Sequence, residues 1–305
     1  MRAGLLLLLV AACASSRDGY YAAAWSPNGK LIAIGTGHSL RIEDAESRAL
    51  VREIETGGTV HAVRFTADGD QVLFCGRGNT FSLAPIDGEP LGHPEINPVV
   101  GLSAAMSADA RTILSVSAEN DFLVWRHPFD KPERRLTGGG YPWTYALTPD
   151  GRYAIGTTPD GQVLRWDVDT GRRDPLVNAH NAYIFAVAMS HDGRHFVSGG
   201  SARDKTVAVW DPRTFRIEYR IDYGTVVRAL AITPDGRTLA VGGNRRSISL
   251  YDLATGTSQG QIDELEDWPS GIAFSPDGSR LLVTFPRAVA KIYGRAPVEA
   301  RPSPR

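Results

Sequence analysis

Three side chains with the chemistry of a hydrolase lie within 25 residues of one another. They are His180, Ser198 and Asp204, and Trp210 follows them. In serine hydrolases the serine attacks, the histidine takes its proton and the aspartate orients the histidine. The same residue types also form buried structural hydrogen bonds. Whether their role is catalytic or structural therefore depends on the strands and loops that position them.

Metal-ligating residue types are present but do not have the spacing of a known site. Asp167, Asp169 and Gly171 resemble the start of a calcium loop, but Asn178 stands where the closing glutamate belongs, which favours a β-turn. Only His191 and His195 of the seven histidines lie close together, without cysteines or carboxylates at zinc-ligand spacing. We therefore expect no metal, cofactor or catalytic residue.

A four-residue motif recurs along the chain. It consists of serine or threonine, a spacer, aspartate or asparagine, and a residue that is glycine in all copies but one. The seven copies are Ser26–Gly29, Thr66–Gly69, Ser107–Ala110, Thr148–Gly151, Ser190–Gly193, Thr233–Gly236 and Ser275–Gly278. Their period of about 40–43 residues, with short β-prone runs around each turn, is typical of four-stranded propeller blades.

The third run of each repeat carries the strongest family marks. In five copies it ends in an aromatic residue: Trp125, Trp166, Trp210, Tyr251 and Tyr293. Aspartate follows directly after Trp166, Trp210 and Tyr251. From Tyr20 to Gly294 the chain resembles the WD-repeat family, most closely in the fifth repeat. The resemblance implies an all-β, seven-bladed β-propeller of four-stranded antiparallel blades. It also implies that His180, Ser198, Asp204 and Trp210 form a structural hydrogen-bond chain within blade five rather than a catalytic site.

The first strand of each repeat alternates in size. Four residues before the turn's last residue stands a large side chain, and five residues before it an alanine in every copy except one, which has Arg64. Neighbouring residues of a strand point to opposite faces of the sheet. Each blade should therefore present a bulky face to one neighbour and a shallow face to the other.

The start of the first strand is the candidate binding surface. In WD-type propellers it opens onto the top face, around the mouth of the central channel. Aromatic, histidine and arginine side chains gather at these positions, and such side chains anchor protein interfaces. The predicted partner-binding residues are Tyr21, His61, Tyr141, Trp143, Tyr183, Phe185, Arg228 and Trp268. We expect a non-catalytic, monomeric scaffold that binds a protein or peptide.

The alternative function is a propeller enzyme of the lactonase or quinoprotein type, with its site at the channel mouth. A hard metal there would need several oxygen ligands. No aspartate or glutamate stands at the top positions, although Asp222, Glu264 and Asp267 on longer loops could contribute. The chain has 33 Lys and Arg against 34 Asp and Glu, with both signs mixed, so its charge does not indicate nucleic-acid binding.

The N-terminal segment has the pattern of a bacterial lipoprotein signal. Residues 1–12 have a charged start and an apolar run too short to span a bilayer, and Val10-Ala11-Ala12-Cys13 resembles a lipobox. We expect Cys13 to be lipidated and to anchor the protein, with the periplasmic leaflet of the outer membrane as the favoured location. Ordinary cleavage after Ala14 would instead give a soluble periplasmic or secreted protein.

The remaining boundaries follow from these two patterns. Residues 13–19 form a short tether, residues 20–296 the propeller, and residues 297–305 a Pro- and Arg-rich tail. The tail is either the last outer strand or disordered. Cys75, the other cysteine, falls in an apolar strand and is expected to be a small buried hydrophobic side chain.

Overall fold

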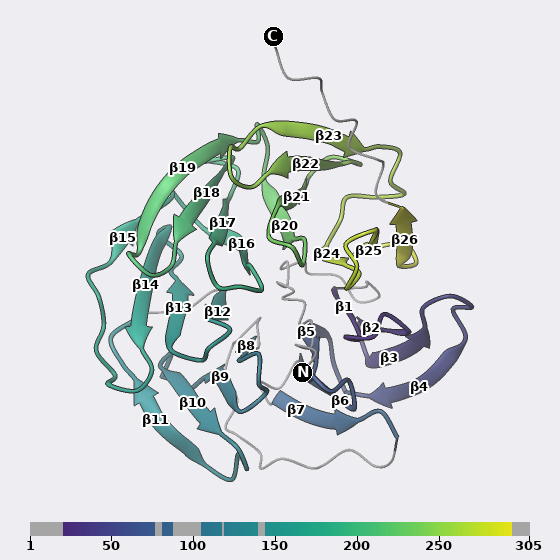
Figure 1. Ribbon diagram of the computed structural model, residues 1–305, viewed down its shortest axis with the longest axis horizontal. Coiled ribbons are helices and arrows are strands. Elements are labelled where there is room, and N and C mark those ends of the chain that lie inside the picture. The colour runs from purple at the N-terminus through teal and green to yellow at the C-terminus, as the bar shows by residue number, and fades with distance from the viewer. Residues whose placement is uncertain (1–20, 77–80, 88–104, 118, 140–143, 295–305) are drawn as a thin grey trace.

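The chain folds into a ring of seven small antiparallel sheets (Figure 1). The computed structural model describes residues 21–76, 81–87, 105–117, 119–139 and 144–294. Within these ranges the regular elements are 26 β-strands. The predicted fold class, an all-β seven-bladed propeller, is confirmed.

Five blades have four strands each, which follow one another from the axis outwards in chain order. Blade 1 consists of β1 (Ala22–Trp25), β2 (Leu31–Gly35), β3 (Ser39–Asp44) and β4 (Leu50–Glu55). Blade 3 consists of β8 (Ala105–Met106), β9 (Thr112–Val116), β10 (Phe122–Arg126) and β11 (Pro132–Leu136). Blade 4 consists of β12 (Tyr145–Leu147), β13 (Tyr153–Thr157), β14 (Gln162–Asp167) and β15 (Val177–Asn178). Blade 5 consists of β16 (Ile184–Met189), β17 (Phe196–Gly200), β18 (Thr206–Asp211) and β19 (Arg216–Asp222). Blade 6 consists of β20 (Val227–Ile232), β21 (Thr238–Gly243), β22 (Ile248–Asp252) and β23 (Ser258–Ile262).

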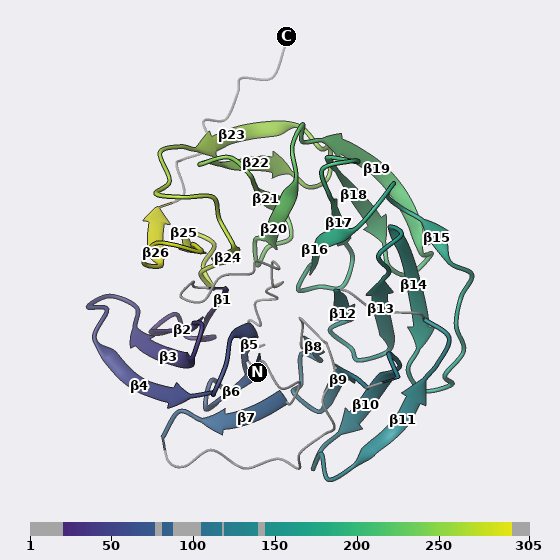
Figure 2. The same ribbon diagram turned by 180° about the vertical axis from the view of Figure 1, so that it is seen from behind.

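The other two blades have three strands within the described ranges. Blade 2 consists of β5 (Val60–Phe65), β6 (Gln71–Gly76) and β7 (Phe81–Pro85). Blade 7 consists of β24 (Gly271–Phe274), β25 (Arg280–Thr284) and β26 (Lys291–Gly294). The proposed signal segment, Cys13, the tether and the tail lie outside the described residues. The view from behind shows blade 7 beside blade 1, where the ring closes (Figure 2).

The repeated motif forms the turn between the first and second strands of every blade. In all seven turns the serine or threonine hydroxyl donates to the aspartate or asparagine Oδ1, at 2.5–2.8 Å. The same Oδ1 accepts the backbone N–H two residues later, as Asp277 does from Ser279 at 3.0 Å. The hydrogen bond from Ser275, with that from Ser279, lowers the pKa of Asp277 to about 2. Because this oxygen accepts two hydrogen bonds, the short motif forms a stable turn.

Neighbouring turns also interlock around the ring. A Cβ placed on Gly193 of blade 5 would lie 3.2 Å from Cδ of Pro149, in the turn of blade 4. The same contact joins Gly69 to Pro27, Gly29 to Pro276 and Gly278 to Pro234. Each proline in a turn therefore packs against the glycine of the next turn, and the Pro276 contact closes the ring from blade 7 to blade 1.

The predicted large-against-small packing between blades is present. Phe65 of blade 2 shares a buried cluster with Ala24 of blade 1, and Trp25 of blade 1 shares one with Ala273 of blade 7. Trp25 Nε1 also donates to the Ala273 carbonyl at 3.1 Å. Arg64, the one exception to alanine, is buried with 2% of its surface exposed.

Candidate functional site

The inner strands begin on one face of the ring, the top face, and end in the repeated turns on the other, the bottom face. Three inner strands have a β-bulge at their start. The bulges lie between Val60 and Ala62, between Ile184 and Ala186, and between Val227 and Ala229. A bulge leaves one residue out of the ladder and redirects its side chain. The residues left out are His61, Phe185 and Arg228, all predicted from the sequence as partner-binding residues.

Four of the predicted residues touch in a row across blades 5, 6 and 7. The rings of Tyr183 and Phe185 are stacked, with centroids 6.2 Å apart and planes at 7°. The guanidinium carbon of Arg228 lies 5.8 Å from the Phe185 centroid and 4.5 Å from the Trp268 centroid. We call Tyr183, Phe185, Arg228 and Trp268 the top-face ladder.

The top-face ladder is accessible at several points. Tyr183 is 43% exposed, and the other three side chains are half-buried. Cation–π contacts fix the guanidinium between two rings, and Arg228 Nε also donates to Asn244 Oδ1. The ladder is thus an ordered aromatic and cationic surface whose side chains need little further ordering on binding.

The other predicted surface residues have different outcomes. Tyr21, predicted to contact a partner, is fully buried, so its side chain is not accessible in this conformation. Its backbone N–H pairs with the Gly35 carbonyl, which draws it into the blade, and its ring lies 6.1 Å from that of half-buried His61. Tyr141 and Trp143 lie outside the described residues.

Sequence reasoning missed the bulges and Asn244. The only available signal is a glycine opposite each bulge, at Gly76, Gly200 and Gly243. A Cβ at Gly243 would lie 2.1 Å from the Val226 carbonyl, so the bulge there needs glycine. Gly35 holds the matching place in blade 1 without a bulge, so glycine alone does not predict one.

The four marked residues of blade 5 form one hydrogen-bond chain. Trp210 Nε1 lies 3.0 Å from Ser198 Oγ, Ser198 Oγ lies 2.9 Å from His180 Nε2, and His180 Nδ1 lies 2.8 Å from Asp204 Oδ1. The indole can only donate, so Ser198 accepts from Trp210. The Asp204 carboxylate can only accept, so Nε2 of the neutral His180 ring accepts from Ser198 Oγ. His180 then carries its proton on Nδ1 and donates it to Asp204.

This order of donors matches a catalytic triad, but its burial does not suit catalysis. Ser198 and Trp210 have no exposed surface, and the His180 side chain has none either. The indole N–H already occupies the serine oxygen. Burial lowers the pKa of His180 despite the opposing hydrogen bond that its ring donates to Asp204, so the imidazole is neutral at neutral pH. These four side chains therefore connect β17, β18 and two loops, and no substrate can reach Ser198 in this conformation.

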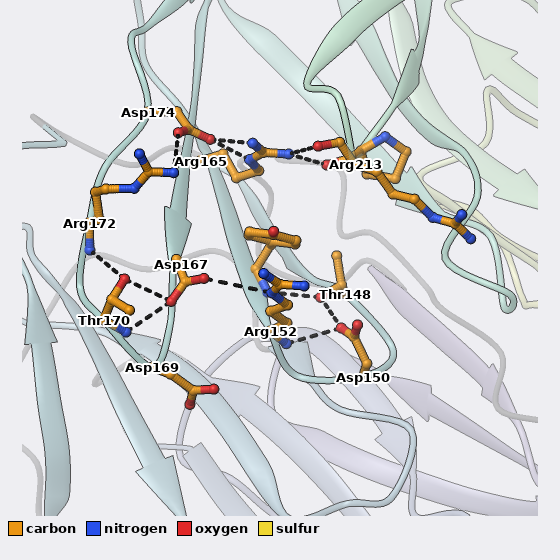
Figure 3. A network of polar contacts seen from close by, with 12 residues as sticks. Thr148, Asp150, Arg152, Arg165, Asp167, Asp169, Thr170, Arg172, Asp174 and Arg213 are labelled. Carbon is orange, nitrogen blue, oxygen red and sulfur yellow. Dashed lines mark hydrogen bonds and ion pairs between the residues drawn. The ribbon is translucent and has the colours of Figure 1, made fainter.

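The bottom face carries a second polar network, between blades 4 and 5 (Figure 3). Arg165 Nε donates to Asp174 at 2.6 Å, and Arg165 Nη1 donates to the Pro212 and Arg213 carbonyls at 2.5 and 2.7 Å. Asp167 accepts from Thr170 and closes the predicted β-turn. A pocket of about 160 Å³ lies beside this network, lined by residues of both blades. The network links the two blades through the Arg165 guanidinium.

The described residues contain neither a group of metal-ligating side chains nor a helix long and apolar enough to cross a membrane. No three His, Cys, Asp or Glu side chains there form a group that could hold a metal ion. Asp222, Glu264 and Asp267 are thus not part of such a group. In the described part of the chain, no helix has the length and apolarity to cross a membrane. Cys75 is buried, which raises the pKa of its thiol to about 12.

Comparison with known families gives matches in blades 4 to 6. The family described as "WD domain, G-beta repeat" matches residues 174–211 and 220–252, which contain the buried hydrogen-bond chain. The chain is similar to WD40 repeats over these two segments. With the seven-bladed fold, these matches support a WD-repeat propeller.

Relatives that match about half of the chain agree. The chain is 25% identical over 160 residues to the WD repeat-containing protein SL1-17 of Schistosoma mansoni, covering 51% of each chain. It is 28% identical to the meiotic recombination protein rec14 of Schizosaccharomyces pombe, covering 56% of this chain and 57% of the relative. It is 28% identical to the small ribosomal subunit protein RACK1y of Oryza sativa, covering 44% and 41%. The chain therefore spans about half the length of these relatives.

Proposed function

We propose that this protein is a non-catalytic scaffold that binds a protein or peptide segment on its top face through the top-face ladder. The continuous contact of Tyr183, Phe185, Arg228 and Trp268 carries the proposal. Aromatic residues and arginine dominate the energetics of protein interfaces. The WD-repeat relatives suggest an interaction scaffold as well. His61, at the bulge of blade 2, extends the proposed binding surface. All of these residues belong to one chain, so we propose that the protein binds its partner as a monomer.

The test removes the two rings that hold Arg228. The double variant Phe185→Ala and Trp268→Ala should keep the fold, because neither side chain is fully buried. Partner capture should weaken at least about 30-fold, which corresponds to about 2 kcal/mol. The readout is quantitative crosslinking pull-down from native membranes, with circular dichroism to check folding.

The matched control removes exposed apolar side chains from another surface. Leu50 and Val51 on the outer strand β4 are each 48% exposed. Leu50→Ala with Val51→Ala should leave capture unchanged. If the ladder variant captures as well as the unchanged protein, or if the control variant loses capture equally, the top-face ladder is not the binding surface.

We further propose that Cys13 carries the lipid and holds the protein in a bacterial envelope, at the periplasmic leaflet of the outer membrane. The motif Val10-Ala11-Ala12-Cys13 is the support for this part, since the relatives named above are eukaryotic proteins. Two or more acyl chains anchor a protein stably. Cys13→Ala should abolish lipid labelling and membrane fractionation. Continued sedimentation with membranes would contradict the anchor.

A further inference from the structure

Arg64 breaks the packing rule of the ring. Five residues before the end of the bottom turn, this inner-strand position faces the next blade. Six blades have alanine there: Ala24, Ala105, Ala146, Ala188, Ala231 and Ala273. In blade 2 the position holds Arg64, opposite Met106 of blade 3. A long cationic side chain thus lies where the other junctions accept only a methyl group.

The guanidinium of Arg64 is only partly used. Its Nη1 donates to the Met106 carbonyl at 2.6 Å. Its Nε and Nη2 are buried, and no acceptor among the described residues bonds to either. These two nitrogens share one edge of the planar group, so their N–H bonds point in the same direction. That edge is the fork that binds a carboxylate or another oxyanion with two parallel hydrogen bonds.

The surroundings make this unpaired edge costly. Burial lowers the pKa of Arg64 to about 10, so the group remains a cation at neutral pH. The adjoining buried cluster, which includes Ala62, Leu73 and Met106, offers it apolar atoms. An uncompensated buried charge is strongly destabilising. Arg165, 8% exposed, shows the contrast, because Asp174 and two carbonyls use its donors.

We propose that the Nε–Nη2 edge of Arg64 is an anion-binding element at the junction of blades 2 and 3, and that it takes a small carboxylate or other oxyanion. The anion would supply both acceptors and the counter-charge. The edge is closed from solvent, so the ligand is a small free ion rather than a polypeptide, and it enters during local opening of the junction. The proposal is independent of partner binding on the top face.

Thermal unfolding of the full chain tests this site, because a ligand that binds only the folded state raises Tm. Sodium formate, acetate and phosphate are compared with sodium chloride at equal ionic strength and pH. We expect at least one oxyanion to raise Tm by about 2 °C or more, saturably with its concentration. The response to formate against that to phosphate shows whether a planar or a tetrahedral anion fits.

Three variants identify the group responsible. Arg64→Met removes the charge and fork and should abolish the oxyanion response. Arg64→Lys keeps a charge but lacks the fork, so it tests the proposal even if the Met variant does not fold. Arg165→Met, the matched control, should retain the response. A Tm of the unchanged protein equal in all four salts, an adventitious rise that does not saturate, or a response retained without the Arg64 fork would overturn the proposal.

Discussion

At the scale of single residues, one set of side chains has the residue types of a catalytic triad but is buried like core side chains. The sequence identified His180, Ser198, Asp204 and Trp210 because their types and spacing match a family pattern. Their role depends on which oxygen the indole N–H reaches, and that follows only from the packed strands. Trp210 Nε1 donates to Ser198 Oγ, and both residues are fully buried.

Trp210 should therefore be among the most sensitive positions. Trp210→Ala removes a fully buried ring and should lower the free energy of unfolding by about 3–5 kcal/mol. Trp210→Phe keeps apolar bulk but leaves Ser198 without its donor, and should cost about 1–3 kcal/mol. Urea unfolding of both variants is the measurement. An alanine variant as stable as the unchanged protein would contradict this assignment.

His180 should make the free energy of unfolding depend on pH in mildly acidic solution. Its folded-state pKa is lowered by burial from the ordinary value of 6.5. Below pH 6.5 the unfolded chain therefore takes up a proton that the folded state refuses, and stability falls as pH falls until the folded pKa is reached. The slope is at most about 1.4 kcal/mol per pH unit for one proton.

The measurement is urea unfolding from pH 7.5 to 5. His180→Gln should be less stable at neutral pH but should show a weaker loss toward pH 5. His191→Gln, which removes a histidine outside the hydrogen-bond chain, should keep the acid sensitivity of the unchanged protein. Identical pH profiles for the His180 variant and the unchanged protein would exclude His180 as the source.

At the scale of elements, the bottom turns were readable from the sequence and the bulges were not. A turn motif is local, so residue types suffice to predict it, and all seven predicted turns are present with the same side-chain hydrogen bond. A bulge depends on how two strands twist against their neighbours. The length of β15 was also not predicted from the sequence. This strand has only two residues and follows Pro175, which has no N–H to donate to a neighbouring strand.

The turn of blade 3 offers a stabilising substitution. Ala110 has a φ of 56°, a left-handed conformation that glycine has in the other six turns. Ala110→Gly should raise the free energy of unfolding by about 0.5–1 kcal/mol, the strain relieved less the entropy lost. Gly193→Ala should lower it by about 1–2 kcal/mol, since Gly193 has a φ of 67° and contacts Pro149. Chemical unfolding of the two variants should show changes of opposite sign in the free energy of unfolding. Changes of equal sign would contradict the strain assigned to a side chain at this left-handed position.

At the scale of the whole molecule, side chains close the ring where blade 7 meets blade 1. Besides the contacts of Trp25 and Pro276, Arg48 Nη1 donates to the Ala290 carbonyl at 3.1 Å. The Arg280 guanidinium carbon lies 4.8 Å from the Trp25 ring centroid. The sequence predicted seven blades and their packing faces, because both repeat. The partners across the closing junction are single residues far apart in the chain, so no repeat reveals them.

Overfilling this junction should weaken the whole ring. Ala273→Leu places a large side chain against Trp25 at a fully buried position and should cost about 1–3 kcal/mol. Val289, 60% exposed on the same blade, provides the control, and Val289→Leu should leave stability unchanged. Thermal unfolding measures both. An unaffected Ala273 variant would mean that the junction is not tightly packed.

The central claim is that the top face holds the partner, and site-specific photo-crosslinking in the native cell tests it most directly. A photoreactive amino acid replaces Tyr183 on the top-face ladder in one protein and Arg237, just after a bottom turn, in another. Both positions are exposed, so both probes reach solvent. We predict a discrete crosslinked partner from position 183 and none from position 237. The reverse pattern, or the same partner from both positions, would contradict binding through the top face.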